Sequence, residues 1–220
     1  MKVYAINGSP RTNWNTGQLL VQALKGAASK GAETELIHLY NLDYKGCTSC
    51  FGCKLKGGKS YGKCAMRDGL TPLLNKLETA NAFLIGSPIY FGTVTGEVRS
   101  FMERLLFPYM VYAQPPQSLF ENNIRTAFIY TMNVSEDVAK QYQYPVHFDV
   151  NEKYLARMFG QAETLCAYET LQFEDYDKVV FDYFDPAERR TKYAETFPKY
   201  CRQAFEMGSR MTKPLVIETK

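Results

Sequence analysis

The sequence has no apolar run long enough to cross a bilayer and almost no net charge. None of its hydrophobic stretches approaches the ~20 residues that a transmembrane helix needs. The formal net charge is +3 and is spread along the chain, so nucleic-acid binding has little electrostatic support. The first residues lead directly into an apolar β-like run, without the charged and apolar regions of a secretory signal. We therefore expect a cytoplasmic protein.

Histidine and glycine-rich phosphate motifs are also scarce. The two histidines, His38 and His147, belong to no HExxH motif and lie beside no paired carboxylates. A hydrolase or zinc peptidase therefore has no support, and we interpret each histidine as structural. The dinucleotide fingerprint GxGxxG and the Walker motif GxxxxGK(S/T) are absent from the start of the chain, where Gly8 and Gly17 are the only glycines.

What the sequence does have is a phosphate-like site within its first 30 residues. Residues 2–6 are rich in β-formers, residues 7–16 in Gly, Pro and small polar side chains, and residues 17–30 have helical periodicity. When a loop leads from a strand into a helix, the free backbone N–H groups of the first helical turn and the positive end of the helix dipole point toward that loop. This arrangement predicts an anion site, and a phosphate fits it.

Side chains of this loop add donors and a charge. Arg11 brings a permanent positive charge. The other candidate phosphate ligands carry hydroxyl or amide groups: Ser9, Thr12, Asn13, Asn15 and Thr16. An alternative needs no ligand, because Asn15 and Gln18 have the spacing of a capping box. Capping leaves Ser9 and Arg11 without a role, so we favour the phosphate site.

Strands and helices alternate along the rest of the chain. Strands are predicted at residues 35–39, 82–86, 126–130 and 163–168. Helices are predicted at 71–80, 95–106 and 190–211, and another helix ends at residue 159 and follows Asp149 and Glu152, which have the spacing of a capping box. This alternation implies a parallel sheet with helices on both faces, and 220 residues fit one domain (residues 1–220). Residues 107–123 and 141–150 are aromatic and aperiodic, and we interpret them as insertions.

Two further loops follow predicted strands. In an open parallel sheet, ligands lie beyond the carboxyl ends of the strands where the strand order reverses. The sequence SPIYFG at residues 87–92 offers flat apolar surface and close backbone approach to a planar ring. Its candidate ring contacts are Pro88, Ile89, Tyr90, Phe91 and Gly92, joined after the next strand by Thr131, Met132 and Asn133. The alternative is that residues 88–91 form only a packed turn.

On the motifs GSPRTNWNT at residues 8–16 and SPIYFG at residues 87–92, the sequence resembles the flavodoxin-like NAD(P)H-dependent FMN reductases and the iron–sulfur flavoproteins. The resemblance extends from residue 2 to about residue 211. It implies a flavodoxin-like, doubly wound, five-stranded parallel sheet. It also implies FMN as the cofactor, with its phosphate in the first loop and its isoalloxazine ring beside SPIYFG. The match of YTMN at residues 130–133 is weaker.

Four of the six cysteines cluster in a loop of residues 44–68. Three thiols at C-x2-C-x2-C can hold three corners of a 4Fe-4S cluster, with a later cysteine at the fourth, which makes candidate ligands of Cys47, Cys50, Cys53 and Cys64. The iron–sulfur flavoproteins have such a motif with a shorter final gap. Structural thiols and a zinc site are the alternatives, although the second C-x2-C pair of a zinc ribbon is missing.

The remaining cysteines, Cys166 and Cys201, lie singly in a predicted strand and helix. Because free cysteine packs as a small hydrophobe, we interpret both as core residues.

Together these patterns predict an FMN-dependent oxidoreductase that passes electrons from NAD(P)H to a quinone, a flavin or another small acceptor. No catalytic side chain is assigned, because the flavin carries the chemistry. The alternative is an electron-transfer flavoprotein that passes electrons to a protein partner. The apolar residues of 107–120 further predict a homodimer or homotetramer, or else a lid folded on its own domain.

Overall fold

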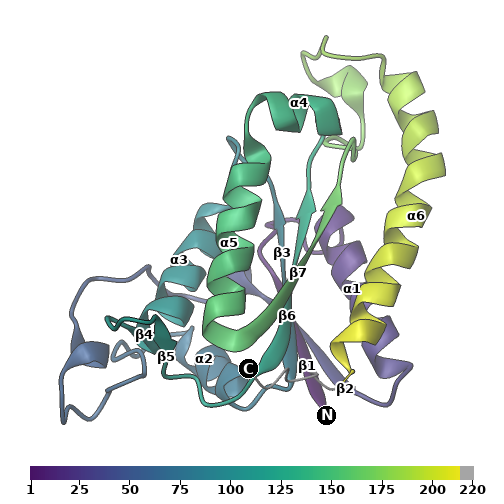
Figure 1. Cartoon of the computed structure of the whole chain (residues 1–220). Coiled ribbons are helices and arrows are strands. Elements are labelled where there is room, and N and C mark those ends of the chain that lie inside the picture. Colours follow the sequence, from purple (N-terminus) through teal and green to yellow (C-terminus); the bar gives the residue numbers. More distant parts are fainter. Residues whose placement is uncertain (214–220) are drawn as a thin grey trace.

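The computed structural model describes residues 1–213 and contains a five-stranded parallel sheet between two layers of helices (Figure 1). The strand order is β2-β1-β3-β6-β7, and every neighbouring pair is parallel. The strands are β1 (Lys2–Asn7), β2 (Glu33–His38), β3 (Ala82–Pro88), β6 (Ile124–Thr131) and β7 (Gly160–Ala167). The predicted flavodoxin-like fold class is confirmed.

The helices form two layers, each over its own apolar core. One layer contains α1 (Asn15–Ala28) and α6 (Pro186–Met211), which cover the same face of the sheet. The other face is covered by α2 (Thr71–Glu78), α3 (Gly96–Leu106), α4 (Glu136–Gln141) and α5 (Tyr144–Phe159). Strands with helices on both faces are apolar throughout, as the burial of β3 shows. In the described part of the chain, no helix combines the length and hydropathy that spanning a bilayer requires.

Helices α1 and α6 approach each other closely through two glycines. A Cβ atom added at Gly26 would lie 1.9 Å from the carbonyl oxygen of Phe205, and one at Gly208 would lie 1.7 Å from that of Ala23. Backbone therefore packs on backbone, and no other residue fits at these positions without a shift. The contact fixes α6 against α1, whose first turn forms part of the predicted phosphate site.

The two aromatic segments differ from the prediction. Within residues 107–123 lies a short hairpin of β4 (Met110–Val111) and β5 (Gln117–Ser118). Beside it, Tyr109 and Phe120 pack edge-on against Phe159, with ring centroids 5.6 and 4.9 Å away. Tyr109 and Phe120 therefore pack on their own domain, which is the arrangement expected of a lid.

The prediction that residues 141–150 are irregular is wrong. Helix α5 begins at Tyr144, with Pro145 in its first turn, so Asp149 and Glu152 lie inside the helix and do not cap it. The aromatic and β-branched residues obscured the helical period, whereas a proline in a first helical turn needs no hydrogen-bond donor.

Candidate functional site

The three loops predicted to bind a ligand meet at the carboxyl edge of the sheet. The strand order reverses between β1 and β3, and β6 lies beside β3. The backbone N–H of Gly8 donates to the carbonyl of Gly86 (2.8 Å), and that of Ile89 donates to the carbonyl of Thr131 (2.9 Å). The hydroxyls of Thr16 and Thr131 lie 2.8 Å apart in a buried contact. The structure thus brings all three sets of predicted residues together.

The loop between β1 and α1 (residues 8–17, the phosphate loop) contains unpaired backbone donors. Helix α1 has Trp14 as its N-cap, and this residue makes no side-chain cap bond. Among the residues that the structure describes, five backbone N–H groups here find no acceptor: those of Thr12, Asn13, Asn15, Thr16 and Gly17. Three of these residues are buried, where an unpaired N–H is costly. An anion such as a phosphate monoester would satisfy these donors, so the loop fits that group.

Glycine is required at the end of this loop. A Cβ atom at Gly17 would lie 1.9 Å from the carbonyl oxygen of Thr12, because the chain turns tightly into the helix. The capping box is not formed: the side chain of Gln18 donates to the carbonyl of Asn13 at 3.1 Å. The Asn15–Gln18 pair on which the capping alternative depends is therefore not formed.

The polar side chains of the loop are already engaged. The hydroxyl of Ser9 bonds the backbone of Arg11 at 3.2 Å. The amide of Asn15 donates to the carbonyl of Leu171 (2.8 Å) and accepts from the hydroxyl of Tyr193 (2.7 Å). Asn15 thus ties the start of α1 to the C-terminal part of the chain, a role that its sequence position did not indicate.

Arg11 also contacts that part of the chain. Its Nη1 donates to the carbonyl of Gln172 at 2.6 Å, and its guanidinium lies 4.8 Å from the ring centre of Trp14. The residue remains exposed, and Asn13 beside it is exposed too. A positive charge is therefore held at the rim of the phosphate loop.

The SPIYFG loop forms a tight turn that presents aromatic rings to solvent. The backbone N–H of Tyr90 donates to the carbonyl of Thr93 (2.9 Å), with Phe91 and Gly92 between them at φ of +50° and +82°. A left-handed conformation at a phenylalanine stores strain, and such strain concentrates at binding sites. The side chain of Phe91 is fully exposed and that of Tyr90 is nearly half exposed. Flat apolar surface thus lies beside the phosphate loop.

The neighbouring predicted contacts occupy the ends of β3 and β6. Pro88 ends β3 and Ile89 follows it, while Met132 is buried just beyond β6. The side-chain amide of Asn133 donates to Oε1 of Gln172 at 2.7 Å. Thr95, at the start of α3, accepts from the backbone N–H of Val98 and donates to the carbonyl of Gly8. This last bond links the SPIYFG side of the site to the phosphate loop.

Neither histidine has catalytic surroundings. Nδ1 of His38 lies 3.1 Å from the amide nitrogen of Asn7, and burial lowers the pKa of His38 below its usual value. His147 is exposed on α5.

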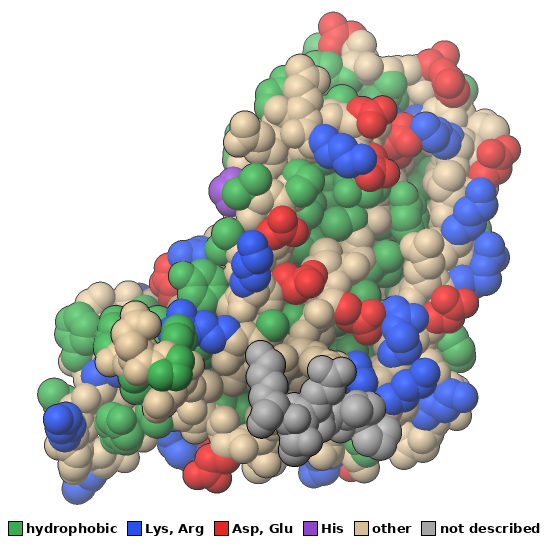
Figure 2. All heavy atoms as spheres, in the orientation of Figure 1, with side chains coloured by type: hydrophobic (Ala, Val, Ile, Leu, Met, Phe, Trp, Pro, Cys, Tyr) green, Lys and Arg blue, Asp and Glu red, His purple; other side chains and the backbone are tan. Residues whose placement is uncertain are grey.

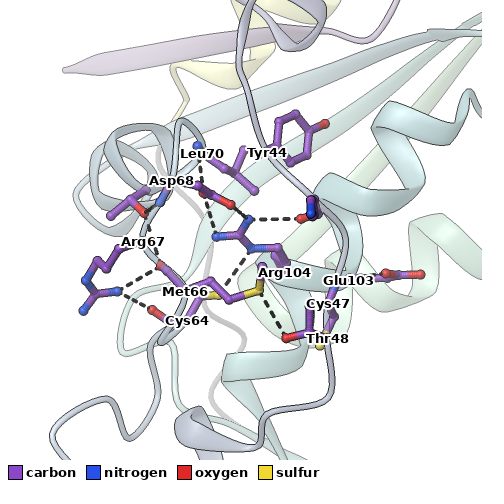
Figure 3. A network of polar contacts seen from close by, with 12 residues as sticks. Tyr44, Cys47, Thr48, Cys64, Met66, Arg67, Asp68, Leu70, Glu103 and Arg104 are labelled. Atoms are coloured by element: carbon purple, nitrogen blue, oxygen red, sulfur yellow. Dashed lines mark hydrogen bonds and ion pairs between the residues drawn. The ribbon is translucent and has the colours of Figure 1, made fainter.

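The cysteine loop (residues 44–68) is organised around a buried arginine (Figure 3). The guanidinium of Arg104, from α3, is fully buried and bonds both carboxylate oxygens of Asp68, at 3.0 Å for the Nη2–Oδ1 pair. Its Nε donates to the sulfur of Cys64 at 3.3 Å, and its Nη1 to the carbonyl of Lys45 at 3.0 Å. Burial opposes ionisation of Asp68, but the bonds from Arg104 outweigh it and hold the pKa of Asp68 below its usual value.

The cysteines of this loop are not gathered around a common centre. Cys47 and Cys50 are exposed, Cys53 is buried, and Cys64 lies between these extremes. Burial raises the pKa of the Cys53 thiol. Among residues 1–213, no three His, Cys, Asp or Glu side chains are arranged to hold a metal ion. The described arrangement therefore does not fit a 4Fe-4S cluster or zinc.

The other two cysteines are partly buried. Cys166 packs against the core on the α5 side and Cys201 against the core under α6, close to their predicted role. Burial raises the pKa of Cys166 to about 11.

An apolar cavity of about 440 Å³ separates the cysteine loop from α5. Its walls come from the cysteine loop, α3, the hairpin and α5, and include Cys47, Phe51, Phe107, Met110, Tyr112 and Tyr154. None of the three ligand loops contributes to its lining. The cavity is therefore distinct from the carboxyl-edge site.

Residues 1–135 match the model of the NADPH-dependent FMN reductase family. The chain belongs to this family. It is 38% identical over 104 residues to an iron–sulfur flavoprotein from Methanocaldococcus jannaschii, covering 47% of this chain and 51% of the relative. An iron–sulfur flavoprotein from Archaeoglobus fulgidus is 40% identical over 104 residues, covering 47% and 48%. In these matches the chain spans about half the length of each relative.

Solved structures agree on the fold. An FMN-dependent NADH-azoreductase from Bacillus anthracis in complex with FMN superposes with a TM-score of 0.65 at 14% identity, over 97% of this chain and 100% of that one. An NAD(P)H:quinone oxidoreductase from Methanothermobacter marburgensis superposes with a TM-score of 0.71 at 10% identity, over 95% and 98%. At these identities the likeness establishes the fold alone.

Some residues of the site escaped the sequence analysis. Trp14 donates its Nε1–H to the carbonyl of Leu171 at 2.9 Å, and Tyr193 bonds Asn15. The stretch that begins at Leu171 is acidic and aromatic, and this composition is the signal that its sequence gives.

Proposed function

We propose that this protein is a cytoplasmic FMN-dependent oxidoreductase that uses electrons from NAD(P)H to reduce a quinone, a flavin or another small acceptor. The observation that carries the proposal is the set of five backbone N–H groups in the phosphate loop that find no acceptor within residues 1–213, beside exposed aromatic surface at the strand-order reversal. A buried phosphate monoester would complete these hydrogen bonds.

In this proposal each loop has a distinct role. The backbone N–H groups hold the FMN phosphate, and Arg11 adds a charge-assisted contact, with Ser9, Asn13 and Thr16 nearby. Residues 88–92 and 131–133 border the ring and orient it through apolar faces and backbone groups. When bound, FMN supplies the ability to accept a hydride from the nicotinamide and to pass electrons onward. The chain itself binds, orients and partly desolvates the reactants.

Steady-state oxidation of NADH and NADPH with a quinone or ferricyanide tests the enzyme. We expect FMN-dependent turnover of at least about one per second, a rate at the low end for enzymes. A protein that binds FMN but shows almost no turnover with any small acceptor would be a carrier instead.

The second candidate is an electron-transfer flavoprotein that passes electrons from FMN, with a 4Fe-4S cluster, to a protein partner. The cysteine spacing and the printed names of the two archaeal relatives support it. It requires the cysteine loop to rearrange, since the described cysteines do not converge. After anaerobic reconstitution, about four irons per chain, lost in Cys50→Ala, would support this candidate, whereas less than about one iron per four chains would exclude it.

We also propose that the protein forms a homodimer or homotetramer. Apolar side chains recur every four residues along α5 and are 42% to 55% exposed: Val146, Val150 and Tyr154. Such a stripe on one helix face suits a second copy of this chain. Light scattering at micromolar concentration should give a multiple of the 25.2 kDa chain mass, and Val146→Glu should reduce it. A monomer mass for the unsubstituted protein contradicts the assembly.

A further inference from the structure

One buried side chain shapes the phosphate loop from the strand before it. Asn7, the last residue of β1, is completely buried. Its Oδ1 accepts from the backbone N–H of Ser9 at 3.0 Å, and its Nδ2 donates to the carbonyl of Thr12 at 3.3 Å. The carbonyl of Thr12 is also the atom that leaves no room for a side chain at Gly17. Asn7 thus fixes two points of the turn that leads into α1.

The second N–H of the same amide is bonded to a histidine on the neighbouring strand. Nδ2 of Asn7 lies 3.1 Å from Nδ1 of His38, the last residue of β2, and the two residues are partners in the parallel register of the sheet. Because the amide oxygen of Asn7 faces the N–H of Ser9, its nitrogen is the donor toward His38. Nδ1 of His38 must therefore accept, which only the neutral imidazole with its proton on Nε2 can do.

The surroundings of His38 do not favour its protonated form. The elements packed on or next to it are β1, α1, the phosphate loop, β2 itself and the turn after β2. Their titratable side chains are Lys2, Tyr4, Arg11, Lys25, Glu33, Glu35 and Tyr40. Within residues 1–213, none of these shifts the pKa of His38, which burial lowers. The side chain is only half-buried, so a proton can reach it from solvent.

Protonation of His38 would place two donors face to face. The imidazolium carries an N–H on both ring nitrogens, so Nδ1 could no longer accept from Asn7. If the ring turned away, a buried amide N–H would lose its acceptor. If the amide rotated instead, it would turn a donor toward the N–H of Ser9. Either change costs hydrogen bonds that give the phosphate loop its shape.

We propose that neutral His38 is a positioning residue for the phosphate site and acts through Asn7. The inference rests on the proposed FMN site, whose backbone N–H groups are aligned by the turn that Asn7 holds. The polar contact of His38 is with Asn7 and not with the loop itself, so His38 shapes the site without touching the ligand. FMN should therefore bind most tightly while His38 is neutral and more weakly as His38 takes up a proton.

The test compares the unsubstituted protein with His38→Asn, by equilibrium ultrafiltration of FMN between about pH 8 and about pH 5. In the variant, Oδ1 can take the place of Nδ1 and accept from Asn7 at every pH. The FMN phosphate itself takes up a proton near about pH 6, so the two Kd values are compared at each pH. The pKa of His38 lies below its usual value, so the ratio of Kd(unsubstituted) to Kd(His38→Asn) should be near one at neutral pH and roughly fivefold at the acid end.

A second measurement follows the proton itself. The chain has two histidines, and the other one, His147, is exposed on α5, on the face that Figure 2 shows with histidine in purple. Proton NMR follows the imidazole C–H resonances through a pH titration with and without FMN, and His147→Asn assigns them. Because binding and protonation are linked, FMN should lower the pH at which His38 titrates and leave that of His147 unchanged.

Matched variants separate the hydrogen bond from other roles of the side chain. His147→Asn removes the exposed histidine, and its FMN affinity should follow that of the unsubstituted protein at every pH. His38→Leu keeps a side chain of moderate size without an acceptor, so it should bind FMN more weakly than His38→Asn throughout the range.

Two results overturn the role of His38 and leave the proposed function standing. The first is a Kd ratio that stays constant with pH while FMN still binds. The second is a relative gain of FMN affinity in the unsubstituted protein at acid pH, because His38 would then act as a cation that attracts the phosphate. If the unsubstituted protein binds no FMN at neutral pH, the proposed function fails together with the inference.

Discussion

The phosphate loop and the cysteine loop both looked like ligand sites in the sequence, but their polar groups are used differently. The phosphate loop leaves five backbone N–H groups without an acceptor in the described chain, three of them in buried residues. The cysteine loop has its central charge, Arg104, bonded to Asp68, Cys64 and Lys45. Unsatisfied buried donors indicate a missing ligand, whereas a satisfied network indicates a structural role.

The two loops are also stabilised by different contacts. Arg104 stabilises its own loop through bonds to Asp68, Cys64 and the carbonyl of Lys45. The phosphate loop keeps its donors aligned through a tight glycine turn and through contacts to residues far along the chain. Variants at the two loops should therefore affect different measurements.

The largest expected effect is on stability, at Arg104. Arg104→Leu leaves Asp68 without its partner and frees the cysteine loop, which should cost about 2–4 kcal/mol of unfolding free energy in urea denaturation. FMN affinity of the folded fraction should change little. A large loss of FMN affinity with unchanged stability would show that this network serves the ligand.

The next effect is on binding, at Gly17. Gly17→Ala forces the backbone away from the carbonyl of Thr12 and misaligns the unpaired donors, so FMN affinity should fall by about 2 kcal/mol. Gly96→Ala is the matched control, because it also lies in the first turn of a helix and a Cβ there meets nothing within 4 Å. Equal FMN affinities for the two variants would remove the loop from the site.

Arg11 should have an effect of similar size. Arg11→Ala removes a charge-assisted contact and should weaken FMN binding by roughly one to two decades, as measured by fluorescence titration. Arg11→Lys keeps the charge and should recover part of the loss. Unchanged affinity in Arg11→Ala would mean that its bond to Gln172 is its main role.

The smallest effect is the pH dependence from Asp68. Its pKa is depressed in the folded protein, so its contribution to stability is present above the unfolded value, about 3.9, and is lost as pH falls through the folded value. As pH falls through this range, the unfolding free energy should decrease. In Asp68→Asn, the plot of unfolding free energy against pH should be flatter over the same range. A curve of the same slope in the variant would show that other carboxylates cause the loss.

Local patterns predicted much of the fold and which three loops meet at the candidate site. All five strands were predicted within a few residues of their positions, and α3 begins one residue after its predicted start. The phosphate loop was predictable because its donors lie within ten residues of one another along the chain. The start of α5 was not, because the aromatic and β-branched residues of its first turns hide the helical period.

The segment that begins at Leu171 could not be placed from the sequence for a different reason. Its contacts to Arg11, Trp14 and Asn15 pass through main-chain carbonyls more than 150 residues away in the sequence, and a carbonyl leaves no trace in residue identity. The Arg104–Asp68 pair escaped for a related reason, since its partners come from a loop and a helix 36 residues apart. Long-range polar contacts need the fold before they can be recognised.

The most direct test of the central claim compares FMN with riboflavin, which lacks the phosphate. The chain has one tryptophan, Trp14, and it lies in the phosphate loop, so its fluorescence reports binding at the site itself. If the unpaired N–H groups hold the phosphate, FMN should bind at least about 100-fold more tightly than riboflavin. Equal affinities for the two flavins would contradict the account, because the loop would then contribute nothing to recognition.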